Sequence, residues 1–143
     1  MRFPQATCRR WGAQREVFSI AMTSPYKGKT GLKRIWNAFF YSLDGLAAAF
    51  RHEYAFRVDL LLALVLIPVA LAMPVSGVAK ALMIASVILV LVAELINSAI
   101  EAVTDRISLE QHELAKRAKD LGSAVVLISL INVAVVWLLV LFG

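Results

Sequence analysis

Apolar residues recur at intervals of three and four positions after Gly31, at Leu32, Ile35, Trp36, Phe39, Phe40, Leu43, Leu46, Ala47 and Phe50. This spacing predicts an amphipathic helix over about 31–52, because residues three and four apart share one helix face. The opposite face carries polar residues: Lys33, Arg34, Asn37, Asp44 and Arg51. Aromatic and leucine side chains opposite basic ones are typical of a helix that lies in the headgroup layer of a membrane.

Three long apolar runs follow, at about 56–73, 79–103 and 121–142. Each is close to the ~20 residues that a helix needs to cross the hydrocarbon of a bilayer. The first run contains Pro68, and the residues from Pro74 to Gly77 predict a tight turn before the second. The predicted fold class is all-α: three transmembrane helices after an N-terminal amphipathic interfacial helix, in one membrane domain over 23–143.

Composition and charge support a membrane protein and argue against a soluble protein and a nucleic-acid-binding protein. Of the 143 residues, 60% are hydrophobic and 17% are charged, and a soluble core of this size cannot bury three long apolar runs. Ten of the fifteen Lys and Arg residues lie at or before Arg57, and four lie between Arg106 and Lys119. This asymmetry fits the positive-inside rule, with the N-terminus and the 104–120 connection in the cytoplasm, and not a nucleic-acid-binding surface.

The first 22 residues contain four Arg, one acidic residue and no apolar run long enough for a signal peptide. We interpret this segment as a disordered extension, or as a misassigned start with Met22 as the true first residue. A transit peptide is the alternative.

A polar stripe interrupts the end of the second apolar run. At 100° per residue, Glu101 and Asp105 each lie about 20° from Glu94 around a helix, while Ser98 lies about 40° and Asn97 about 60° away. An acidic residue at a bilayer centre costs roughly 2.5–3.5 kcal/mol, which favours a functional role over a purely structural one. The deepest carboxylate, Glu94, is suited to act as a base for a lipid hydroxyl, and one nearer water to hold a divalent cation. The alternative is that these polar groups only stabilise helix contacts.

Two further polar clusters lie at the predicted cytoplasmic interface. The segment from Glu53 to Asp59 precedes the first span, where Glu53 would be able to share a metal with Glu101. The second cluster begins with Glu110, Gln111, His112 and Glu113 and ends with Lys116, Arg117, Lys119 and Asp120. Cations beside a membrane can bind phosphates or anionic headgroups, or only mark the cytoplasmic side.

Local signals predict where the last helix begins and where helices approach closely. Ser108 and Gln111 fit a capping box, which predicts a helix from Leu109 that continues through the Lys- and Asp-rich segment into the third span. The small residues in Ser98-Ala99 and in Gly122-Ser123-Ala124 allow membrane helices to pack closely.

Three other site types are not supported. Cys8 is the only cysteine, and the two histidines, His52 and His112, form no zinc-binding pattern. Gly28-Lys29-Thr30 resembles the end of a phosphate-binding loop, but Thr23 stands where that motif needs glycine.

The chain from about Leu32 to Phe142 resembles the small integral-membrane prokaryotic diacylglycerol kinases. The most specific element is the segment from Glu94 to Arg106, with Glu94, Asn97, Glu101 and Asp105 in the family's order and spacing. Further support comes from His112-Glu113-Leu114, from Arg117 to Ala124, and from Glu53 to Arg57.

This resemblance implies transfer of the ATP γ-phosphate to the hydroxyl of 1,2-diacylglycerol, which gives phosphatidate in phospholipid metabolism. It implies a homotrimer in the bacterial inner membrane, with active sites between subunits and magnesium as cofactor. Glu94 would be the general base, and Glu53 and Glu101 would hold the metal. The nucleotide would contact Arg34, Tyr41, Glu53, Glu101, Glu110, Gln111, His112, Lys119 and Asp120. The lipid and phosphoryl end would involve Glu94, Asn97, Ser98, Ser123, Arg57 and Asp59.

The chain departs from the family pattern at Leu43, Asp44, Asp59 and Gln111, which affects detailed ATP and lipid contacts but not the catalytic stripe. Some relatives phosphorylate undecaprenol, so an undecaprenol kinase is the nearest alternative. A small transporter that uses the intramembrane Glu, or a structural subunit whose polar stripe drives oligomerisation, are alternatives from other classes.

Overall fold

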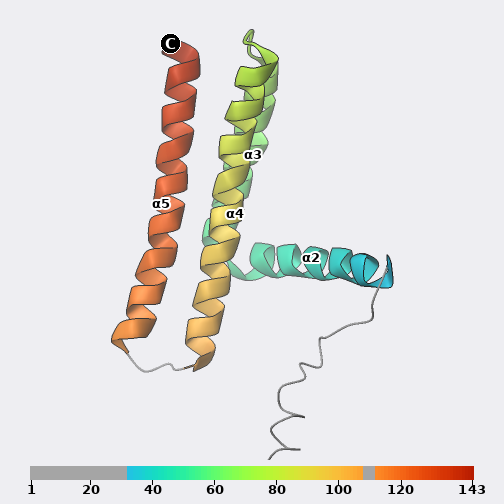
Figure 1. Ribbon diagram of the computed structural model, residues 1–143, viewed down its shortest axis with the longest axis vertical. Coiled ribbons are helices and arrows are strands. Elements are labelled where there is room, and N and C mark those ends of the chain that lie inside the picture. Colours follow the sequence, from blue (N-terminus) through green and yellow to red (C-terminus); the bar gives the residue numbers. More distant parts are fainter. Residues whose placement is uncertain (1–31, 108–111) are drawn as a thin grey trace, which may run out of the picture. The chain divides into compact units, whose positions relative to one another are not determined.

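The computed structural model describes residues 32–107 and 112–143, and these residues form four α-helices (Figure 1). Several predictions lie outside the described residues: the 1–22 extension, the Ser108–Gln111 capping box, and the nucleotide contacts assigned to Glu110 and Gln111.

Helix α2 spans Leu32–His52, as the apolar spacing predicts. Its large apolar side chains are exposed, including Trp36, Phe39 and Phe40, whose rings meet edge to face. Its last turn carries Arg51, and a cationic side chain there interacts favourably with the negative end of the helix dipole. The position of this helix at a membrane surface stays a prediction.

The three predicted spans are helices: α3 spans Tyr54–Ala72, α4 spans Gly77–Ile107 and α5 spans Glu113–Phe142. Each is long and apolar enough to cross a membrane. Both α4 and α5 are longer than their apolar runs, because the helical backbone hydrogen bonds continue through the polar segments that flank them. Helix α3 includes Pro68, so the backbone carbonyl one turn earlier lacks its usual donor.

The connection between α3 and α4 differs from the predicted turn. Gly77 is the first residue of α4 and not part of a turn. The hydroxyl of Ser76 accepts a hydrogen bond from the Ala79 backbone N–H at 3.2 Å, as an N-cap residue does. The Lys80 ammonium donates to the Leu71 carbonyl at 2.7 Å and so satisfies one of the free carbonyls at the end of α3.

The start of α5 also differs from the prediction. His112 has an extended backbone (φ −112°, ψ 134°) and is the N-cap, so the helix that enters the third span begins at Glu113 and not at Leu109. Its Nδ1 accepts a hydrogen bond from the Leu114 backbone N–H at 3.2 Å. From Glu113 the helix continues unbroken through the Lys- and Asp-rich segment to Phe142, as predicted.

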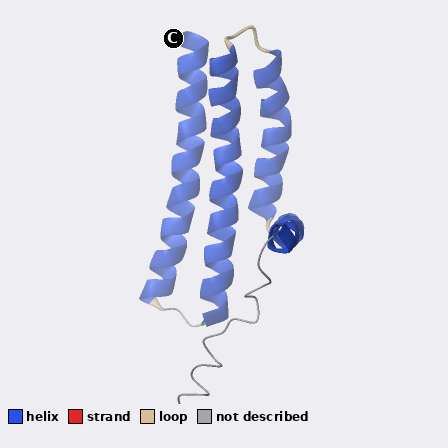
Figure 2. Ribbon diagram, turned by 45° about the vertical axis from the view of Figure 1, so that its right-hand side comes forward, coloured by secondary structure: helices blue, strands red, loops and turns tan. Residues whose placement is uncertain are grey.

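Helix α4 lies between α3 and α5 and packs against both (Figure 2). Its buried residues follow one stripe with helical spacing: Met83, Ser86, Val87, Val90, Ala93, Glu94 and Asn97. The buried residues of its neighbours lie one helical repeat of seven apart, at Phe56, Ala63 and Ala70 in α3 and at Gly122 and Ser129 in α5. Small residues at these contacts let helix backbones approach closely, which is how membrane helices associate.

Candidate active site

The buried stripe of α4 changes from apolar to polar along its length. It begins with Met83 and Val87 and ends with Glu94 and Asn97, which are 4% and 8% exposed. The helix period alone places Glu94 there, since it lies seven and eleven residues after Val87 and Met83. Within the described residues the only ion pair joins Lys119 to Asp105, so Glu94 has no cationic partner in that part of the chain. An unpaired buried carboxylate is costly to the fold.

Three other carboxylates act electrostatically on Glu94. The negative charges of Asp59, Glu101 and Glu53 all act on its carboxyl group. Asp59 lies in α3, Glu53 immediately precedes that helix, and Glu101 lies two turns after Glu94 in α4. The packing of α3 against α4 therefore brings together the two acidic clusters that the sequence holds apart. No three acidic, histidine or cysteine side chains among the described residues are close enough to bind a metal by themselves.

Glu53 keeps its carboxylate available. It is the N-cap residue of α3, with an extended backbone (φ −103°, ψ 114°), but its side chain makes no capping hydrogen bond. Its backbone N–H donates to the Ala49 carbonyl at 2.9 Å. The main chain thus holds Glu53 in place without using its side chain.

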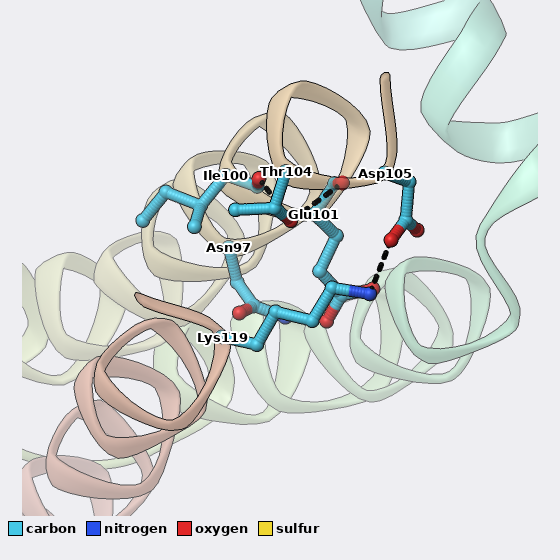
Figure 3. Close-up of polar contacts among 6 residues, drawn as sticks. All are labelled: Asn97, Ile100, Glu101, Thr104, Asp105 and Lys119. Atoms are coloured by element: carbon cyan, nitrogen blue, oxygen red, sulfur yellow. Dashed lines mark hydrogen bonds and ion pairs between the residues drawn. The ribbon is translucent and has the colours of Figure 1, made fainter. Parts of the chain in front are cut away.

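Glu101 is oriented by its neighbour one turn earlier. The side-chain amide of Asn97 donates from Nδ2 to Oε1 of Glu101 at 3.0 Å (Figure 3). A carboxylate only accepts hydrogen bonds, so the amide oxygen of Asn97 must face the other way. That Oδ1 atom is buried, and neither it nor the buried Ser98 hydroxyl has a hydrogen-bond partner within the described residues.

Lys119 reaches from α5 to α4. Its ammonium lies 2.5 Å from Oδ1 of Asp105 (Figure 3), and the charge of Glu101 also acts on it. Thr104, between these acids in sequence, donates its hydroxyl to the Ile100 and Glu101 carbonyls, both at 2.9 Å. Lys119 therefore lies beside the carboxylates of Asp105 and Glu101 where α4 ends and α5 begins. We refer to this region as the α4–α5 end.

Two predicted lipid-site residues bind backbone groups. The guanidinium of Arg57 donates from one nitrogen to the carbonyls of Phe50 and Arg51, both at 3.2 Å, and lies 5.7 Å from the Tyr54 ring centre. The Ser123 hydroxyl donates to the Lys119 carbonyl at 3.1 Å, within α5. Arg57 thus satisfies free carbonyls at the end of α2.

The remaining predicted nucleotide contacts are dispersed. Arg34 and Tyr41 are exposed side chains of α2. His112 caps α5, and Asp120 is exposed on that helix one residue after Lys119. The charges of Glu53, Asp59 and Glu101 act on Glu94, whereas among the described residues no contact links Arg34, Tyr41, His112 or Asp120 to these acids.

The sequence does not predict the contacts of two residues in this region, Asp105 and Gly122. The sequence pattern predicts Asp105 on the polar stripe but assigns it no partner. Its charge, one turn after Glu101, together with the basic segment around Lys119, would have been a reason to expect the ion pair. Gly122 was predicted only as a close-packing position. It is buried, and a side chain there would collide with Asn97.

Known proteins match most of the chain. The sequence profile of the family described as "Prokaryotic diacylglycerol kinase" matches residues 40–141. A Pseudomonas aeruginosa protein named diacylglycerol kinase is 57% identical over 120 residues, which cover 84% of this chain and 98% of that protein. Proteins of the same name are 50% identical in Haemophilus influenzae, over 79% of this chain and 96% of that protein, and 46% identical in Escherichia coli K12, over 80% and 93%.

Proposed function

We propose a catalytic arrangement for this chain, which belongs to the prokaryotic diacylglycerol kinase family and is a multi-pass membrane enzyme of that activity. In this arrangement the γ-phosphate of ATP passes to the hydroxyl of 1,2-diacylglycerol, and the products are phosphatidate and ADP. ATP binds at the α4–α5 end, and the lipid hydroxyl approaches Glu94 from the bilayer.

The observation that carries this arrangement is the burial of Glu94 among other carboxylates, without a cation within the described residues. Such a carboxylate is costly to the fold but well placed to accept a proton. As the lipid oxygen bonds to the γ-phosphorus, its proton passes to Glu94 and the bond from phosphorus to the β,γ-bridging oxygen breaks. ADP leaves with that oxygen, and Glu94 afterwards releases its proton to water.

Charge balance in the site calls for a divalent cation. Glu53, Asp59, Glu94, Glu101 and Asp105 would repel a nucleoside triphosphate, and within residues 32–107 and 112–143 only Lys119 forms an ion pair with a member of this group. Carboxylate oxygens suit Mg²⁺, which is usually held by one or two carboxylates together with substrate phosphates. The free carboxylate of Glu53 and the oriented carboxylate of Glu101 fit that role. When bound, the ion would offset the charge of the transferred phosphoryl group.

Other side chains complete the proposed site. Lys119 would exchange part of its contact with Asp105 for a phosphate oxygen, with Asp120, His112, Arg34, Tyr41, Glu110 and Gln111 as further nucleotide contacts. Asn97, Ser98, Asp59, Ser123 and Arg57 would shape the lipid and phosphoryl end. The unpartnered Ser98 hydroxyl supports this placement because buried polar atoms normally have a partner.

Assembly and orientation belong to the same proposal. We expect a homotrimer, with active sites shared between subunits, in the bacterial inner membrane with the N-terminus in the cytoplasm. Much of the apolar surface of α5 is exposed in the single chain, including Leu127, Ile128, Ile131 and Leu138. Such a surface is suited to contact lipid and neighbouring subunits.

Purified protein in detergent, supplied with Mg²⁺ and ATP labelled at the γ-phosphate, tests the activity. Diacylglycerol, undecaprenol and no added lipid form the panel. We expect labelled phosphatidate with diacylglycerol and little label with undecaprenol. Preferential labelling of undecaprenol would assign the alternative acceptor, and no labelled lipid in any reaction would contradict the kinase assignment.

The role of Glu101 is tested by a magnesium titration of Glu101→Gln. The amide keeps the size and one acceptor but removes the charge, so we expect the half-saturating Mg²⁺ concentration to rise at least about tenfold, a loss of about 1.4 kcal/mol. A titration that matches that of the unaltered protein would exclude Glu101 as a metal ligand.

A further inference from the structure

Helix α5 approaches α4 closely at Gly122, next to Asn97. A Cβ atom added to this residue would collide with Oδ1 of Asn97, and would lie 3.4 Å from its Cγ and 3.6 Å from its Cα. The backbone of α5 is helical here, a conformation that any residue adopts. Space, and not backbone conformation, is therefore what requires glycine at this position.

The atom that a side chain would displace is the one that fixes the amide of Asn97. Because Nδ2 donates to Glu101, Oδ1 must point away from that carboxylate, and it points toward Gly122. Oδ1 is buried and has no hydrogen-bond partner within the described residues. An added methyl group would force the Asn97 side chain into another rotamer and break its contact with Glu101.

We infer that Gly122 is a positioning residue for the phosphoryl-transfer site, which acts through Asn97 to hold the Glu101 carboxylate in its ligand orientation. This inference rests on the proposed function, because it assumes that Glu101 binds the metal–nucleotide complex. Supporting residues of this kind matter because a ligand that must first reorient binds its metal more weakly. In the proposed site, Gly122 itself contacts neither substrate nor metal.

The chain offers a matched control. Gly77 is also helical, and a Cβ added there meets no atom within 4 Å. Alanine is the better helix former, so Gly77→Ala tests the general effect of the substitution without a collision. The test set is Gly122→Ala, Asn97→Ala, the double variant and Gly77→Ala, each as the full chain in detergent micelles.

The primary measurement is the dissociation constant of Mn²⁺, followed by electron paramagnetic resonance with a non-hydrolysable ATP analogue present, since binding needs no turnover. Gly122→Ala should raise this constant at least tenfold and Gly77→Ala less than twofold. The double variant should lie within twofold of Asn97→Ala, because Gly122 acts only through that side chain. The inference is overturned if Gly122→Ala matches Gly77→Ala, or if the two single effects multiply in the double variant.

Two further measurements separate this inference from the proposed function: the side-chain amide resonance of Asn97, and Mn²⁺ binding by Glu101→Gln. The side-chain amide resonance of Asn97 should shift in Gly122→Ala and in Glu101→Gln, whatever Glu101 binds. If the resonance shifts in both while Glu101→Gln leaves Mn²⁺ binding unchanged, the positioning contact stands and the metal role of Glu101 fails. If Glu101→Gln weakens Mn²⁺ binding but the resonance in Gly122→Ala stays unshifted, Gly122 has no such role.

Misfolding would also be informative. If Gly122→Ala does not fold, Asn97→Ala should restore folding in the double variant, because it removes the atoms that collide. A double variant that also fails to fold contradicts the inference.

Discussion

Lys119 is paired with Asp105, a carboxylate to which the proposed mechanism gives no direct step. The pair with Asp105 joins two side chains that are 38% and 54% exposed, so solvent and salt weaken its contribution to stability. Its effect is instead on position, since it draws a flexible ammonium from α5 toward the acids of α4. We therefore expect Asp105 to act on nucleotide binding through Lys119.

Asp105→Asn tests this view at the level of a single residue. We expect the free energy of unfolding to change by less than about 1 kcal/mol, as for other exposed ion pairs. The KM for ATP should rise about three- to tenfold, with a smaller change in kcat, because the mobile ammonium must be ordered on binding. Steady-state kinetics at saturating lipid measure both constants. An unchanged KM would assign the pair no part in nucleotide binding.

Residue-level contacts were the least predictable part of the site. The helix period placed Glu94, Asn97 and Glu101 on one face, and the structure confirms that Glu94 and Asn97 are buried there. The period does not specify how α5 is rotated about its axis relative to α4. The Lys119–Asp105 pair and the approach of Gly122 to Asn97 depend on that rotation, so they required the structure.

At the level of elements, the start of α5 shows how local capping positions a candidate site residue. His112 satisfies a free N–H of the first turn, and N-cap substitution by alanine costs about 0.5–2 kcal/mol. The proposed nucleotide contact and the cap use the same side chain. A loss of activity on substitution is therefore ambiguous unless the cap is kept.

Two substitutions at His112 separate these roles. His112→Asn keeps a strong N-cap acceptor, so we expect stability within about 0.5 kcal/mol of the unaltered protein, whereas His112→Ala should lose about 1 kcal/mol. If the imidazole contacts ATP, both variants should show a raised KM for ATP. Thermal unfolding in detergent and steady-state kinetics give the two readouts. A normal KM in His112→Asn would leave His112 with a capping role alone.

The helices themselves were largely predictable because apolar length is a strong signal in a membrane protein. The amphipathic helix and the three long apolar helices are all present, with ends that differ from the predicted ones. The interfacial position of the first helix stays a prediction. The capping-box pattern of Ser108 and Gln111 predicts a start at Leu109, but the extended backbone of His112 prevents an unbroken helix from that point. The capping-box pattern at Ser108 and the N-cap at His112 are two possible helix starts, and the sequence alone does not show which of them is used.

For the whole molecule, the proposed ATP site is compatible with only one orientation in the membrane. The α3–α4 connection and the C-terminus lie at one end of the three-helix unit, and the α4–α5 end lies at the other (Figure 2). Because ATP is a cytoplasmic substrate, the proposed ATP site requires the α4–α5 end to face the cytoplasm. The basic residues Lys116, Arg117 and Lys119 at that end agree with the positive-inside rule.

Cysteine labelling in intact cells tests the orientation. In a background with Cys8→Ser, Pro74→Cys should react with a membrane-impermeant maleimide from outside, because it lies in the α3–α4 connection. Lys116→Cys should react only after permeabilisation. The reverse pattern would place the proposed nucleotide site on the wrong side of the membrane.

The proposed role of Glu94 as acceptor of the lipid proton is tested by the rate of phosphatidate formation by Glu94→Gln. Glutamine has nearly the same volume, so the elution volume in gel filtration should not change. We expect kcat to fall at least about 100-fold, the lower range for loss of a general base, with the KM for ATP little affected. A folded Glu94→Gln protein whose kcat stays within about tenfold of the unaltered enzyme would contradict it.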